Sequence, residues 1–108
     1  MSVFPARILV VDDEAPIRDI LYQYLSDRGH EVKQAADGAQ ALSCLAEGDV
    51  ELVVTDIRMP VMGGLELLGQ IGARRHDVGV LMLTACDDVS SAVQAMKSGA
   101  LDYVLKPF

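Results

Sequence analysis

Chemically reactive side chains follow four separate apolar segments of the chain, each at the point where the segment ends. They comprise three carboxylates, one hydroxyl and one ammonium group. The residues are Asp12 and Asp13 after segment 7–11, Asp56 after 52–55, Thr84 after 78–83 and Lys106 after 101–105. Groups that lie just past the carboxyl ends of parallel strands converge on one crevice. The sequence therefore predicts a single site built from residues that are far apart along the chain.

The residue types at this site favour magnesium-assisted phosphoryl transfer. Three neighbouring carboxylates repel one another, and at least one pKa rises unless a cation intervenes. A donor set rich in oxygen and free of thiols suits Mg²⁺. Asp56 can then attack phosphorus, as carboxylates do when an aspartyl phosphate forms. Mg²⁺, the Lys106 ammonium and the Thr84 hydroxyl are available to the three oxygens of the transferred group.

Each of these residues also has an ordinary structural explanation when it is taken alone. The Asp12–Asp13 pair can cap a helix and complement its dipole. Asp56 can belong to a turn, Thr84 can cap the next segment, and Lys106 can be a solvated surface lysine. What favours a functional site is that all of them occur at the ends of successive predicted strands.

The segments between these residues predict an α/β fold of one domain over residues 1–108. Short apolar strands alternate with amphipathic helices, which implies a parallel sheet with right-handed crossovers. Gly29 and Gly99 are expected to end helices, and Asp37 to begin one. The predicted strands are 7–11, 31–35, 52–55, 78–83 and 101–105. Buried helical stripes are expected from Ile17, Ile20, Leu21, Tyr24 and Leu25, from Ala41, Leu42 and Leu45, and from Val89, Ala92, Val93 and Met96.

Composition narrows the classes of protein and partner. The chain has 108 residues, of which 51% are hydrophobic, so it can bury a continuous sheet and disorder is not expected. A formal net charge of −7 argues against direct nucleic-acid binding, which needs a basic face. No apolar run approaches the roughly 20 residues that span a bilayer. We therefore expect a cytoplasmic protein without a membrane partner.

The chain resembles, essentially from end to end, the receiver domains of bacterial two-component response regulators. The matching motifs are 10–14 (VVDDE), 54–60 (VTDIRMP), 83–85 (LTA) and 99–108 (GALDYVLKPF). The resemblance implies a flavodoxin-like, doubly wound five-stranded sheet in the order 2-1-3-4-5. It also implies that Asp56 is the phosphoacceptor, and that Asp13, Asp56 and the backbone carbonyl of Arg58 bind Mg²⁺ directly, with Asp12 acting through water.

The resemblance also assigns residues to the phosphoryl group and to a switch. Lys106 is expected to contact the phosphoryl group, and the bond between Lys106 and Pro107 to be cis. Thr84 and Tyr103 form the expected switch pair: the Thr84 hydroxyl moves inward and the Tyr103 ring turns into the space that it leaves. The side chains of Arg58 and Cys86 are expected to tune the lifetime of the phosphoryl group.

The function implied by the resemblance is a phosphorylation-dependent signalling switch that accepts its phosphoryl group from a sensor histidine kinase. Such a domain catalyses only its own phosphorylation and dephosphorylation and controls an output domain, usually in the same chain and often in transcription regulation. Segment 88–100 is most similar to receivers of the nitrogen-regulator type. A stand-alone phosphorelay or chemotaxis-type receiver is the alternative. A haloacid-dehalogenase-type phosphatase and a flavodoxin-like nucleotide-binding module fit less well, because the first predicted strand is followed by neither DxD nor a phosphate-binding loop.

Two features depart from the family pattern. Gly63 stands where the family usually has Asp or Asn, so the helix that follows should begin less firmly. The sequence also stops before the final helix of the family, which covers one face of the sheet. An apolar face is then expected to be exposed, and homodimerisation is one expected consequence.

Overall fold

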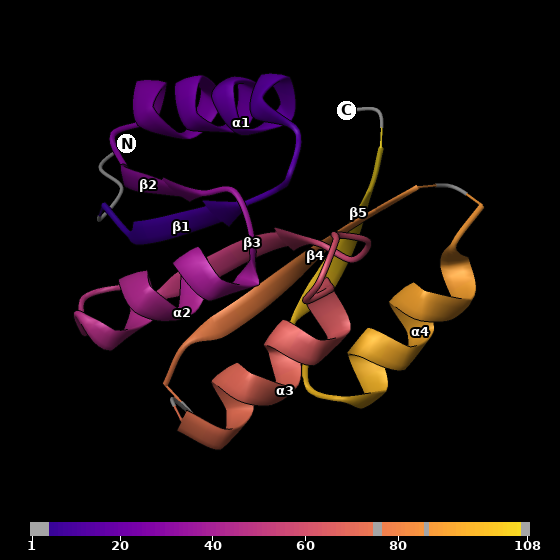
Figure 1. Ribbon diagram of the computed structural model, residues 1–108. Coiled ribbons are helices and arrows are strands. Elements are labelled where there is room, and N and C mark those ends of the chain that lie inside the picture. The colour runs from indigo at the N-terminus through magenta and orange to yellow at the C-terminus, as the bar shows by residue number, and fades with distance from the viewer. Residues whose placement is uncertain (1–4, 75–76, 86, 107–108) are drawn as a thin grey trace.

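The computed structural model of the chain describes residues 5–74, 77–85 and 87–106. Within them, strands and helices alternate along the chain as the sequence pattern predicts (Figure 1). The elements are β1 (Arg7–Val11), α1 (Ala15–Asp27), β2 (Glu31–Ala35), α2 (Gly38–Ala46), β3 (Leu52–Asp56), α3 (Gly64–Arg74), β4 (Gly79–Ala85), α4 (Val89–Lys97) and β5 (Asp102–Lys106).

All five strands are parallel and follow the order β2-β1-β3-β4-β5, which confirms the flavodoxin-like fold expected from the resemblance. The register aligns the carboxyl ends of the strands. Val11 lies opposite Thr55, and Asp56 lies opposite Leu83. Ala85 in turn lies opposite Lys106. The carboxyl ends of β1, β3, β4 and β5 therefore meet at one edge of the sheet.

The inner strands are apolar because they are covered on both faces, as is typical of parallel sheets. Leu9, Val10 and Val11 of β1 and Val53 of β3 are completely buried. The edge strand β2 carries Lys33 and other polar residues and is largely exposed. These inner strands fix the backbone positions from which the reactive side chains extend.

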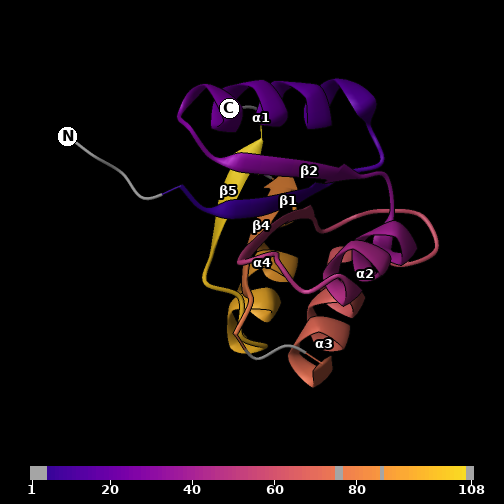
Figure 2. The same cartoon turned by 90° about the vertical axis from the view of Figure 1, so that its left-hand side faces the viewer.

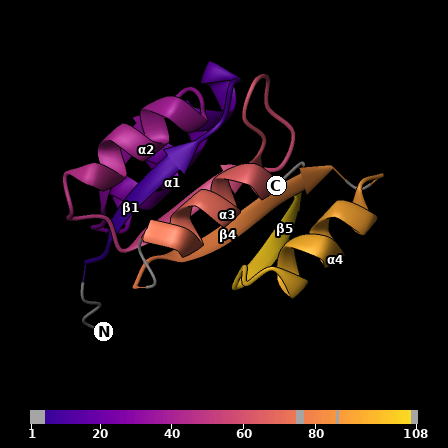
Figure 3. The same cartoon turned by 60° about the horizontal axis from the view of Figure 1, so that its bottom comes forward.

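The helices are distributed unequally over the two faces of the sheet. Helices α2, α3 and α4 lie against one face, whereas α1 alone lies against the other (Figures 1, 2 and 3). The larger core cluster lies on the three-helix side and includes Leu67, Ile71 and Met82. A smaller cluster on the other side contains Val10 and Leu83. Leu21 and Leu25 of α1 pack against this second cluster.

The prediction of a buried stripe on α1 is wrong: none of its five residues is fully buried, and two of them are exposed. Ile20 is 54% exposed and Tyr24 is 53% exposed. Both line an apolar groove of about 480 Å³ between α1 and the neighbouring strands. Among the described residues, no second helix packs beside α1 on this face, so only the inner side of the stripe is covered.

The predicted stripe on α4 is also wrong in part. Val89, Val93 and Met96 are each about 40% exposed or more, whereas Ala92 and Ala95 are buried. Helix α4 lies at the β5 end of the sheet, where only a narrow side of the helix faces the strands. The small alanine side chains let the helix approach the sheet closely and leave the larger residues outside.

The predicted helix ends are confirmed. Gly29 and Gly99 adopt the left-handed conformation, with φ of 91° and 109°, just after α1 and α4. Asp37 precedes α2, and its side chain accepts a hydrogen bond from the Gln40 backbone. No helix within the described part of the chain has the length and apolar character needed to span a membrane.

Gly64, the first residue of α3, lies against the backbone of Asp56. A Cβ atom at this position would meet the Asp56 carbonyl oxygen at 2.3 Å and the Ile57 Cα at 2.9 Å. The Gly64 amide also donates to the Ile57 carbonyl at 2.7 Å. Only glycine lets α3 begin this close to the end of β3.

We expect Gly64→Ala to destabilise the protein by about 2 kcal/mol, because an added methyl group must displace backbone rather than a flexible side chain. Gly69→Ala is the matched control in the same helix, since its Cβ would meet no atom within 4 Å. The control should gain up to about 1 kcal/mol from helix propensity. Urea unfolding measures both, and equal stability of the two variants would contradict the role given to Gly64.

Candidate functional site

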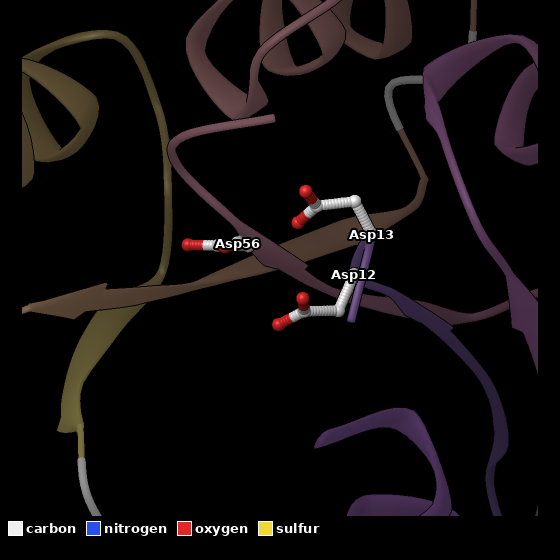
Figure 4. A group of neighbouring side chains, drawn as sticks. All are labelled: Asp12, Asp13 and Asp56. Carbon is white, nitrogen blue, oxygen red and sulfur yellow. The ribbon is translucent and has the colours of Figure 1, made fainter. Parts of the chain in front are cut away.

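Three carboxylates converge at the edge of the sheet, as the sequence predicts. Asp12 and Asp13 follow β1, and Asp56 is the last residue of β3. Figure 4 shows their side chains extending into the same space. Each residue offers one carboxylate oxygen, and these oxygens all lie within 4.8 Å of one another. Asp12 is completely buried, Asp56 is 8% exposed and Asp13 is open to solvent.

Hydrogen bonds from neighbouring elements fix Asp12. Its backbone amide donates to the Ala35 carbonyl of β2 at 3.2 Å, which extends the sheet by one residue. Its side chain accepts from the Glu14 amide at 2.9 Å. The guanidinium of Arg18 in α1 donates to its backbone carbonyl at 2.7 Å. These three contacts fix the position of Asp12, and its carboxylate lies beside that of Asp56.

Lys106 brings a cation to the same place from the end of β5. Its Nζ lies 3.0 Å from Asp12 Oδ2 and 3.2 Å from Asp56 Oδ2. Burial lowers the pKa of Lys106, but the hydrogen bond with Asp12 and the charges of both carboxylates outweigh burial and raise it above its usual value. The amine therefore remains charged and is shared between the two acids.

One lysine does not fully balance the carboxylates. The pKa of Asp56 is raised above its usual value, first by burial, while the Lys106 charge lowers it and the Asp12 charge raises it. The ionised form of Asp56 is thus disfavoured in the protein as it stands. A divalent cation would offset the negative charge of the carboxylates and favour the ionised form of Asp56. The donor set of carboxylate oxygens fits Mg²⁺, and we find the residues present compatible with such an ion.

A cavity of about 240 Å³ opens beside Asp56 on the side away from Asp13. Thr84 and Lys106 line it, together with Arg58 and Asp88 from two neighbouring loops. This cavity gives a small anionic group access to the Asp56 carboxylate. The structure therefore brings together four of the predicted groups: the acids, the lysine, the threonine and the Arg58 segment.

The Thr84 hydroxyl is turned toward the loop that follows β4. It lies 3.3 Å from the Ala85 carbonyl and 3.3 Å from the Asp88 carbonyl, and it donates to this pair of acceptors. Thr84 is buried. Tyr103, its predicted switch partner, is half-buried and packs against the larger core cluster. Cys86 and Pro107, including the predicted cis bond, lie outside the described residues.

Sequence reasoning missed Asp88 as part of the site. The Arg58 Nε lies 2.7 Å from Asp88 Oδ2, and the Asp88 side chain is only 5% exposed. The hydrogen bond from Arg58 is the main cause that lowers the pKa of Asp88 to about 2. An aspartate just before a helix is typical of an N-cap, so its position alone gave no signal of this pairing.

The chain matches the family described as the response regulator receiver domain over residues 8–108. Response regulator MprA of Mycobacterium sp. (strain KMS) is 43% identical over 104 residues, which cover 96% of this chain. The match covers 45% of MprA, so this chain spans less than half the length of that relative.

Solved structures agree with the sequence matches. NtrX from Brucella abortus superposes with a TM-score of 0.93 and 38% identity, covering 97% of this chain and 24% of that one. A receiver domain protein from Clostridium thermocellum superposes with a TM-score of 0.90 and 34% identity. That match covers 95% of this chain and 83% of the other.

We expect Asp56→Asn to raise the Tm of the metal-free protein by about 4 °C. The raised pKa of Asp56 means that folding disfavours its charge, and relief of about 1 kcal/mol moves the Tm of a small domain by this much. The gain should be present above the raised folded pKa of Asp56, where this group is ionised in both the folded and the unfolded state. It should shrink as the pH falls through the raised folded pKa, because the wild-type group then becomes neutral as well.

Thermal unfolding in EDTA and in excess Mg²⁺ measures this effect. Mg²⁺ should raise the Tm of the wild type and should stabilise Asp56→Asn less, since the variant has lost one charged oxygen donor. Asp19→Asn, an exposed acid on α1, is the control and should behave as the wild type. Equal stabilisation of wild type and Asp56→Asn by Mg²⁺ would mean that Asp56 is not a ligand.

Proposed function

The chain belongs to the response regulator receiver domain family, and on this premise we propose that it is a phosphorylation-dependent switch whose phosphoacceptor is Asp56. The observation that carries the proposal is the shared position of Lys106 between Asp12 and Asp56, at the mouth of a cavity that reaches the Asp56 carboxylate. Lys106 is partly buried, and from this position its ammonium can contact an anion that approaches Asp56.

In the proposed reaction, an Asp56 carboxylate oxygen attacks the phosphorus atom of a phosphohistidine. A P–O bond forms while the P–N bond breaks, and the electron pair of that bond leaves with the imidazole nitrogen. The Lys106 ammonium then turns from Asp12 toward one oxygen of the transferred group. The negative charge of that group spreads over its oxygens in the transition state. The Lys106 ammonium, which lies 3.2 Å from Asp56 Oδ2, stabilises this charge and lowers the barrier.

Mg²⁺ is the proposed cofactor. Asp13, Asp56 and the backbone carbonyl of Arg58 are its proposed direct ligands, and Asp12 would act through water. When bound, the ion supplies positive charge that offsets the carboxylates and the phosphoryl oxygens. The mutual approach of the three carboxylates supports this assignment.

We infer a phosphoacceptor domain instead of a phosphatase with turnover. The nucleophile of a haloacid-dehalogenase-type enzyme follows the first strand in a DxD motif, whereas β1 here is followed by Asp12–Asp13–Glu14. The acid that both lines the cavity and contacts the lysine is instead Asp56 at the end of β3. Its own phosphorylation and dephosphorylation are the proposed chemistry.

The proposed switch pair is Thr84 and Tyr103. A phosphoryl group on Asp56 offers the Thr84 hydroxyl a charged acceptor, which is stronger than the two carbonyls that it faces in this structure. Movement of Thr84 into the cavity would vacate space beside β4. Tyr103 lies opposite Met82 on the neighbouring strand and can turn into that space.

A sensor histidine kinase is the proposed partner, and we propose that the domain acts in the cytoplasm. MprA and NtrX are both much longer than this chain, which supports an output domain in the same polypeptide and a role in transcription regulation. A stand-alone relay remains the alternative function. We do not assign nucleic-acid binding to this domain, because its net charge is −7.

We further propose that a second copy of the chain packs in the groove beside α1. The groove is lined by apolar side chains, among them Tyr24, Leu83 and Val104.

Incubation with a small phosphodonor and Mg²⁺ should add one phosphoryl group to the wild type, and Asp56→Asn should abolish the addition. Intact-protein mass spectrometry measures the product. Asp19→Asn keeps Asp56 and should be modified like the wild type. An unmodified wild type, or a modified Asp56→Asn, would remove the basis of the proposed function.

Lys106→Met should change phosphorylation and metal binding in opposite directions. The loss of one charge-stabilising donor is expected to slow phosphorylation by about 100-fold. Mg²⁺ should bind more tightly, because the lysine no longer neutralises Asp12 and Asp56. Phosphorylation kinetics and calorimetric Mg²⁺ titration test the pair of effects. If both fell together, Lys106 would have only a structural role.

A further inference from the structure

The ion pair between Arg58 and Asp88 joins two loops at the rim of the proposed phosphorylation site. Arg58 belongs to the loop between β3 and α3, and Asp88 precedes α4. Their contact, at 2.7 Å, spans 30 residues of sequence. The Arg58 side chain is 76% exposed, whereas that of Asp88 is 5% exposed. The pair therefore joins an exposed guanidinium to a buried carboxylate.

The same acid is linked to the switch threonine through the backbone. The Asp88 carbonyl accepts from the Thr84 hydroxyl, and the Asp88 amide donates to the Ala85 carbonyl at 3.0 Å. This turn ties the end of β4 to the start of α4. A displacement of Asp88 therefore displaces an acceptor of the Thr84 hydroxyl.

Arg58 also faces the cavity beside Asp56, which it lines together with Asp88 and Lys106. A phosphoryl group on Asp56 would place further negative charge in this cavity. Arginine binds phosphate oxygens in a bidentate manner and more strongly than a single carboxylate oxygen, so the two anions compete for one guanidinium. If Arg58 leaves, the Asp88 carboxylate keeps its hydrogen bonds with Ser91 but loses its ion-pair partner, and burial disfavours that state.

We propose that the Arg58–Asp88 pair is a latch that holds the loop after β4, and with it Thr84, in the resting position until a phosphoryl group on Asp56 draws Arg58 away. The inference rests on the proposed function and names a positioning residue, Asp88, for that site. Loss of the pair moves Asp88 toward solvent, withdraws its carbonyl from Thr84 and frees the hydroxyl to turn inward.

Beryllofluoride with Mg²⁺ serves as the probe, because it imitates a phosphoryl group on a carboxylate. Asp88→Asn keeps a good helix cap but loses the charge that holds Arg58. It should bind the probe about 5-fold more tightly than the wild type, within the usual range of coupling between sites. Arg58→Gln also breaks the latch, yet it should bind no more tightly, because it lacks the cation that meets the probe.

Asp87→Asn is the matched control, since it removes the same charge from an adjacent, exposed position. Its affinity should stay within about 2-fold of the wild type, which separates the latch from general electrostatics. Calorimetric titration measures the affinity for the probe of the wild type, Asp88→Asn, Arg58→Gln and Asp87→Asn. A gain for Asp87→Asn equal to that for Asp88→Asn would overturn the proposal.

Backbone amide signals of Thr84 and Ala85, recorded by NMR without the probe, supply a readout that does not depend on binding. In Arg58→Gln, which leaves the buried Asp88 carboxylate without its ion-pair partner, they should shift toward their positions in probe-bound wild type, while those of Asp87→Asn should stay in place. Unshifted signals in Arg58→Gln would overturn the latch alone. Failure of wild type to bind beryllofluoride would overturn the proposed function as well. If Asp88→Asn does not fold, the Arg58→Gln signals still decide.

Discussion

Mutual repulsion among acids is the constraint on which the rest of this structure depends. Asp12 and Asp56 are held nearly out of contact with solvent at one edge of the sheet, where burial disfavours the charge of Asp56. Lys106 offsets part of that cost from the far end of the chain. The negative charge that Lys106 does not balance favours binding of a further cation. The energetic cost of assembling the acids is therefore also the source of the chemistry proposed for them.

The sheet makes this arrangement possible because its strands are parallel and in register. Buried inner strands such as β1 and β3 leave their final residues little freedom, so side chains from remote segments meet reproducibly. Gly64 adds a local condition, since α3 must begin directly against the Asp56 carbonyl. Asp56 is thus fixed by the core on one side and by the start of a helix on the other.

Two loops that surround the site are connected to one another by an ion pair. Arg58 and Asp88 link the loops after β3 and β4, while Thr84 faces the second loop through its hydroxyl. A change of charge at Asp56 therefore acts on contacts that continue toward α4 and β5. The exposed apolar residues of α4 and the groove beside α1 are surfaces to which another segment or protein can bind in response to such a change.

The sequence alone determined the fold class, the strands and the convergence of Asp12, Asp13, Asp56, Thr84 and Lys106, because strand alternation and parallel crossovers leave few arrangements for groups at strand ends. The strand order came from the family resemblance. Tertiary structure decided which helical positions are buried: Ile20 and Val93 follow the predicted periodicity but remain exposed, since burial depends on what packs opposite and periodicity describes only one partner. It also decided that Arg58 pairs with Asp88, because a contact between two loops depends on how the chain brings them together and leaves no local pattern in either segment.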